Sequence, residues 1–111
     1  MSDGLRPSLM SAGFYRGPKA ALAWLTKAFD FELLMLLEDA EGNVAHSEMR
    51  YGTGVVMVGM EWSENHRSPS SIGGKNPQTG HIQVQGDIQA HFERARAAGA
   101  EIISEPAMQF Y

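Results

Sequence analysis

The sequence predicts an α+β domain in which a β-α-β-β-β unit is followed by the start of a second one. Two observations support this: short runs of alternating apolar and polar residues, typical of strands, and two longer runs with apolar residues at helical spacing. At 111 residues with 43% hydrophobic content, the chain is long enough for one core. We therefore expect a single domain, 1–111, with module one at 8–60, a linker at 61–78 and a partial module two at 79–111.

Module one is expected to contain one helix and four strands. The helix opens at Gly17 and Pro18, because proline in the first turn gives up an amide that would be unpaired anyway. Apolar residues then continue at helical spacing to Phe29. Turns rich in Gly and Asn separate short apolar or alternating runs. The expected strands are 8–13, 31–38, 43–51 and 55–60.

Module two is expected to repeat the order strand, helix, strand. The elements are a strand at 80–86, a helix at 87–98 and a strand at 101–104. Asp87 is placed as the helix N-cap, and Gly99 as the left-handed residue after its end. Strand side chains alternate, so His81 lies opposite Ile82 and Val84. The apolar stripe of the helix is expected to pack on the strand face that carries Ile82 and Val84. The opposite face, which carries His81, is therefore expected to meet solvent or a cavity.

Composition argues against several classes of partner. The net charge is 9 − 13 = −4 and no basic cluster is present, which disfavours nucleic acid and anionic membranes. No apolar run approaches the length of a transmembrane helix. The chain has no cysteine, so disulfides, thiolate chemistry and cysteine-based metal sites are excluded, and a cytoplasmic location is expected.

Six residues are candidates for ligand binding, and each has a purely structural alternative. His81 is the first, with a hydrogen-bonded surface histidine as its alternative. His46 and Arg50 share one face of the strand 43–51 with Glu48, which is either a polar pocket wall or a solvated face with an ion pair. Three further side chains suit an adaptable apolar cavity or ordinary core packing: Met10, Met57 and Trp62. No catalytic residue is assigned, because no Ser-His-Asp, Walker, dinucleotide or HExxH pattern is present.

The stretches 20–31, 46–52 and 80–82, with 95–102 after them, resemble one known family. It is the glyoxalase/bleomycin-resistance/dioxygenase superfamily, also called the vicinal oxygen chelate superfamily, in its glyoxalase-like and PhnB-like members. The resemblance implies paired β-α-β-β-β modules whose curved mixed sheets surround a shared cavity. In this chain the second module would lack its last two strands.

The resemblance also implies where a metal would bind. Metal-dependent members hold a divalent metal with four inward side chains, one on the first and one on the last strand of each module. The matching positions here are Met10, Met57 (with Glu61 as a shifted possibility) and His81, and the fourth falls on a strand the chain does not contain. A thioether is a soft ligand, unsuited to ions that chelate oxygen. The cofactor is therefore unknown: a divalent metal stays an alternative with an incomplete ligand set, and no metal residue is assigned.

Three functions remain open at this stage. The first is a glyoxalase-like small-molecule-binding protein or enzyme of unknown substrate. The second is a non-catalytic dimer of the bleomycin-resistance type that sequesters a drug or metabolite, and a weaker third is a metal-dependent lyase or dioxygenase. Because members of the family commonly pair, sometimes by exchanging modules, and the linker 61–78 is long enough to permit it, the resemblance implies a homodimer with a small-molecule ligand.

Overall fold

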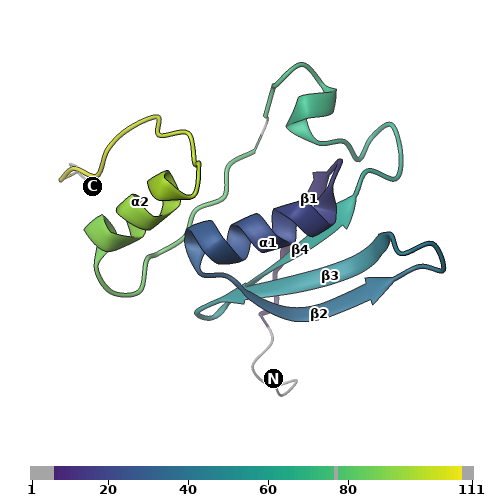
Figure 1. Cartoon of the computed structure of the whole chain (residues 1–111), viewed down its shortest axis with the longest axis horizontal. Helices are drawn as coiled ribbons and strands as arrows, with labels where there is room; N and C mark the ends of the chain where they lie inside the picture. The colour runs from purple at the N-terminus through teal and green to yellow at the C-terminus, as the bar shows by residue number, and fades with distance from the viewer. Residues whose placement is uncertain (1–6, 77, 109–111) are drawn as a thin grey trace.

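The computed structural model describes residues 7–76 and 78–108 (Figure 1). Its elements are β1 (Ser11–Tyr15), α1 (Pro18–Phe29), β2 (Glu32–Glu38), β3 (Val44–Tyr51), β4 (Gly54–Met60), the 3₁₀ turn η2 (Pro69–Ser71) and α2 (Ile88–Ala97). The four strands form one curved sheet in the order β1-β4-β3-β2, with β1 parallel to β4 and the other pairs antiparallel. The expected α+β class is confirmed.

Helix α1 covers one face of this sheet and builds the core with it. Leu22 and Leu25 are buried against Met49 of β3 and Val58 of β4. The helix begins at Pro18, as expected from the sequence. Helix α1 contacts β1, β2 and β4, whereas α2 lies mainly against α1 (Figure 1). Helix α2 also reaches the sheet through His91, whose ring meets that of Tyr51 on β3 edge-on at 6.0 Å. We call the side of the sheet opposite α1 the open face.

Most of module one follows the prediction, with one shift. The three strands expected at 31–38, 43–51 and 55–60 are each confirmed to within one residue. The first strand, expected at 8–13, instead runs from Ser11 to Tyr15. Its position is set by parallel pairing with β4, where Ser11 lies opposite Val56 and Tyr15 opposite Met60. The local Ser and Gly content carried no information about that register.

Two strands expected in module two are wrong for this structure. Neither 80–86 nor 101–104 joins a ladder, because no strand of the described residues lies beside them and a strand needs a neighbour for its amides and carbonyls. The helix between them is confirmed. Asp87 caps it by accepting a hydrogen bond from the Gln89 amide at 2.9 Å, and Gly99 has φ 100°.

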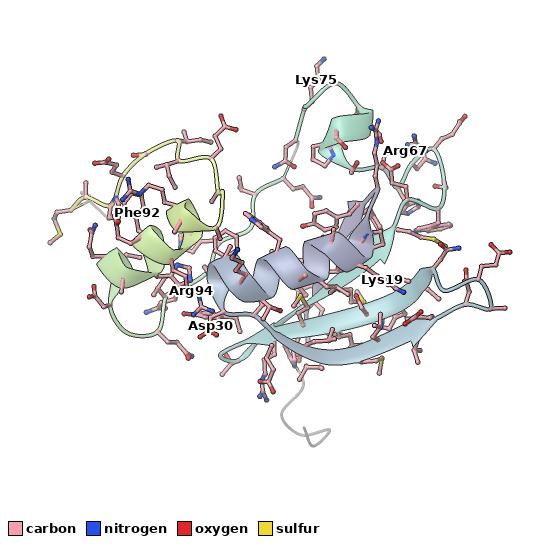
Figure 2. The ribbon with its side chains drawn as sticks, in the orientation of Figure 1. Lys19, Asp30, Arg67, Lys75, Phe92 and Arg94 are labelled. Carbon is pink, nitrogen blue, oxygen red and sulfur yellow. The ribbon has the colours of Figure 1, made fainter. Side chains whose placement is uncertain are left out.

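Helix α2 is attached to the end of α1 by polar contacts (Figure 2). Arg94 Nε donates to the carbonyl of Lys27 at 2.8 Å, and its guanidinium lies 3.6 Å from the Asp30 carboxylate. The indole of Trp24 donates to the Ala98 carbonyl at 2.8 Å. Helix α2 was expected to pack its apolar stripe on a strand at 80–86, and it is instead held against α1 by these contacts. Across the described chain, neither helix has the length and apolar character needed to span a bilayer.

Candidate functional site

The strand register places two rows of side chains across the open face. Met57 pairs with Ala12 on one side and Glu48 on the other, so these three lie in one row. Phe14 pairs with Gly59 in the next row. The small residues Ala12 and Gly59 leave a hollow between larger side chains, and a pocket of about 270 Å³ lies there. The pocket is lined by Ala12, Phe14, Ala45, His46, Met57, Val58, Gly59, Met60 and Trp62.

An aromatic stack forms one wall of this pocket. The Trp62 indole stacks on the His66 imidazole with centroids 4.0 Å apart and an interplanar angle of 23°. Phe14 meets His66 edge-on at 5.3 Å. The His66 ring is held in place because its Nδ1 lies 2.6 Å from the Ser63 hydroxyl. Trp62 nevertheless stays 63% exposed, so much of its apolar surface remains available to a ligand.

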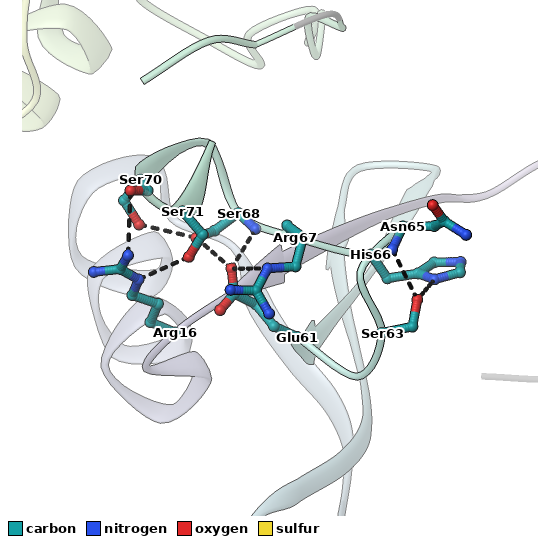
Figure 3. A network of polar contacts seen from close by, with 9 residues as sticks. All are labelled: Arg16, Glu61, Ser63, Asn65, His66, Arg67, Ser68, Ser70 and Ser71. Carbon is teal, nitrogen blue, oxygen red and sulfur yellow. Dashed lines mark hydrogen bonds and ion pairs between the residues drawn. The ribbon is translucent and has the colours of Figure 1, made fainter. Parts of the chain in front are cut away.

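The loop that carries this stack is anchored by the Glu61 carboxylate (Figure 3). The amide and hydroxyl of Ser68 donate to it at 2.7 and 2.9 Å, and Arg67 lies 3.8 Å away. Hydrogen bonds from the Ser71 side chain and the Ser68 backbone lower the pKa of Glu61 from 4.5 to about 2. Arg16 extends the network by donating to the Ser71 hydroxyl at 2.8 Å. The loop after β4 is therefore tied to itself and to the start of α1.

A histidine–carboxylate pair forms the polar part of the site. His46 Nε2 lies 3.0 Å from Glu48 Oε2, two residues along β3 and on the same face. Glu48 is only 5% exposed, whereas the His46 side chain is 38% exposed and lines the pocket. An ionised carboxylate accepts but does not donate, so with Glu48 ionised this contact places a hydrogen on Nε2 of the imidazole.

The structure brings together half of the residues that the sequence singled out. His46, Met57 and Trp62 line the pocket on the open face. Arg50 lies further along β3 and pairs with Glu32 of β2 at 2.5 Å, which was the structural alternative for that residue. Met10 precedes β1 and is not part of the lining.

His81 lies elsewhere in this chain. It is exposed and lines a separate groove of about 420 Å³ between the turn after β3 and the segment 81–85. The groove is held by a hydrogen bond from the Gln85 amide to the Tyr51 hydroxyl at 2.8 Å. The polar face expected from alternation in a strand at 80–86 is therefore not joined to the pocket.

Two residues of the site were missed at the level of sequence. Phe14 belongs to the sheet because β1 continues to Tyr15, whereas the expected strand ended at residue 13. His66 falls within the stretch 61–78 that the sequence predicts to be a linker, and only the fold of this loop stacks its ring on Trp62. The spacing of an aromatic residue and a histidine four apart was the available signal.

The donor set does not fit the divalent metal that the fold family implies. Of its matching positions, Met57 lines the pocket, but Met10 and His81 do not join it. Within 7–76 and 78–108, no three His, Cys, Asp or Glu side chains gather as a metal site would require. No chemical step is therefore assigned to a metal here.

One helix on the back of a curved β1-β4-β3-β2 sheet, with a pocket on its open face, defines a β-α-β-β-β half module of the glyoxalase fold. The family model for the Glyoxalase/Bleomycin resistance protein/Dioxygenase superfamily matches residues 13–111, and the chain belongs to this superfamily. The resemblance noted from the sequence is thereby confirmed.

One solved structure shows the same fold. The crystal structure of TioX from Micromonospora sp. ML1 aligns with a TM-score of 0.65 at 24% identity, covering 95% of this chain and 82% of TioX. At that identity the likeness concerns the fold. No curated protein matches the chain.

Proposed function

We propose that the open-face pocket binds a planar, largely apolar small molecule. The observation that carries this proposal is the Trp62 ring, which is fixed on His66 at 4.0 Å yet remains 63% exposed beside the pocket. A large aromatic surface held rigidly at a pocket is a platform for stacking, because little conformational entropy is lost when a second ring packs on it.

The rest of the lining supports an apolar ligand of modest size. Phe14 and Met57 supply apolar walls, and Met57 can adjust its shape. The volume of about 270 Å³ lies just below the usual range for small-molecule sites, which favours a ligand of one or two fused rings. No Asp, Glu, Lys or Arg is among the described residues that line the pocket, and the nearby Glu48 carboxylate is engaged with His46.

A second function, catalysis, is favoured by one observation. The His46–Glu48 pair has the arrangement of a general base with an orienting carboxylate, which proton-transfer enzymes use. Binding without turnover identifies a sequestering protein, and release of a changed product identifies an enzyme. Substrate-like naphthalene carbonyl compounds followed by mass spectrometry separate the two.

Replacing Trp62 by alanine is expected to weaken binding of 2-methoxynaphthalene about tenfold, because the stacking surface is lost. Isothermal titration of the whole protein measures this. The control is Trp24→Phe, since the Trp24 indole lies between α1 and α2 and donates to the Ala98 carbonyl. Absence of binding to the unaltered protein, or equal affinity in the Trp62 variant, contradicts the proposal.

We also propose that a second copy of the chain covers the open face beside the pocket. Met35 lies in the row of Glu48, and Leu37 in the row of His46, so an apolar strip on β2 continues the pocket surface. These two side chains are 39% and 54% exposed. A strip continuous with a shallow ligand site suits a partner that encloses the same ligand from above.

Leu37→Glu is expected to shift this dimer to monomer, since it places a charge in the strip that the second copy would bury. Size-exclusion chromatography with light scattering measures the mass, and Glu41→Gln in the turn after β2 is the control. A monomer for the unaltered protein at micromolar concentration refutes the dimer.

A further inference from the structure

The His46–Glu48 pair leaves one ring nitrogen unused. In the tautomer that donates Nε2–H to Glu48 Oε2, the other ring nitrogen, Nδ1, carries a lone pair. Among the described residues, His46 has no hydrogen bond other than the one to Glu48. A ring that is oriented by a buried carboxylate presents its other nitrogen as a fixed acceptor, just as carboxylates orient the histidines that bind metals in other proteins.

Among the described residues, the other side chains that line the pocket beside His46 are uncharged. On β1 and β4 its neighbours in the pocket are Ala12, Phe14, Met57 and Gly59, and on β2 its cross-strand neighbour is Leu37. The loop contributes Trp62 to the lining, with the titratable ring of His66 behind it. Of the described side chains that line the pocket, two can form a strong hydrogen bond, the His46 imidazole and the Trp62 indole. The indole N–H is a donor, so the imidazole is the acceptor.

We propose that the pocket selects planar aromatic molecules carrying an O–H or N–H donor, such as phenols, and that this donor bonds to Nδ1 of His46. Glu48 is the positioning residue, because it acts through the imidazole. This inference rests on the proposed function, and it adds the chemical class of the ligand. An aromatic ether of similar shape has no donor and leaves Nδ1 without a hydrogen bond in an apolar site. The ether is therefore expected to bind more weakly than the phenol.

The experiment compares 2-naphthol with 2-methoxynaphthalene on the whole protein by isothermal titration. We expect 2-naphthol to bind about tenfold more tightly, as one hydrogen bond in an apolar site allows. His46→Leu is expected to abolish this preference, so that the two naphthalenes bind the variant with equal affinity. Circular dichroism of the variant, together with its remaining affinity for 2-methoxynaphthalene, shows that the fold and the aromatic pocket are retained.

Glu48→Gln tests the positioning role. An amide can donate or accept, so the tautomer of His46 is no longer fixed and the preference for 2-naphthol is expected to fall partway. Glu38→Gln, an exposed carboxylate on β2, is the matched control and is expected to keep the full preference. A loss of ether binding in Glu48→Gln indicates a structural role and overturns the positioning assignment.

The outcomes separate this inference from the proposed function. If neither naphthalene binds the unaltered protein, the proposed function fails and this inference with it. If both bind with equal affinity, or if His46→Leu keeps the preference, the pocket stands as an aromatic site and only the donor selection is overturned.

Discussion

Met49→Ala lowers the free energy of unfolding by about 2–5 kcal/mol, the range for a large apolar side chain removed from a closed core. Met49 is wholly buried on β3, where it packs with Leu22 and Leu25 of α1 and Val58 of β4. The variant leaves a cavity between the helix and the sheet, and a small domain has few other contacts to offset it. Urea denaturation followed by circular dichroism measures the change.

Ile103→Ala is the matched control for this core variant. Ile103 is 95% exposed, so its loss is expected to change stability by less than about 0.5 kcal/mol. A loss of less than about 1 kcal/mol in the free energy of unfolding for Met49→Ala contradicts a single closed core under α1. It would mean that water or a shift of the sheet fills the space left by the side chain.

The Glu61 carboxylate holds the loop after β4 in acid as well as at neutral pH. Its pKa is lowered from 4.5 to about 2, because the Ser71 side chain and Ser68 backbone donate to its charged form. A lowered pKa in the folded state means that the stabilising contribution is complete above pH 4.5. It is lost as the pH falls from 4.5 to about 2. The Ser68 amide signal in NMR is expected to titrate with a midpoint of about 2.

Glu61→Gln removes this charge and is expected to release the loop at every pH. Ser68 then loses its charged acceptor, and its amide exchanges with solvent faster than in the unaltered protein. Glu64→Gln neutralises an exposed carboxylate of the same loop and is expected to leave the exchange unchanged. A Ser68 titration centred near 4.5 would show that the network in Figure 3 does not hold the carboxylate.

Most elements of module one, all except the bounds of β1, were predictable because they depend on local chemistry. Pro18 favours the start of α1 regardless of what the helix packs against. The turns at Gly42 and Gly52 need a positive φ, which glycine adopts freely. The N-cap Asp87 and Gly99 define α2 in the same way. The division of the chain into two modules with a linker at 61–78 stays a prediction.

The pocket was only partly predictable because it depends on contacts between distant segments. Alternation along β3 correctly put His46 beside Glu48. The same rule failed for His81, since alternation describes a paired strand and the segment 80–86 has no neighbouring strand. Phe14 and His66 entered the site through register and loop folding, neither of which a local pattern specifies.

The sequence by itself determined the family, the helix ends and the strands β2, β3 and β4, because proline, glycine, capping and apolar period act within a few residues of one another. Only the tertiary structure decided which side chains form the binding surface. The register of β1 on β4 arises from the pairing of segments more than forty residues apart. The Glu61 network arises from the fold of an irregular loop. Side chains that are far apart in the sequence come into contact through tertiary packing, and the apolar periodicity of the chain does not specify which of them do so.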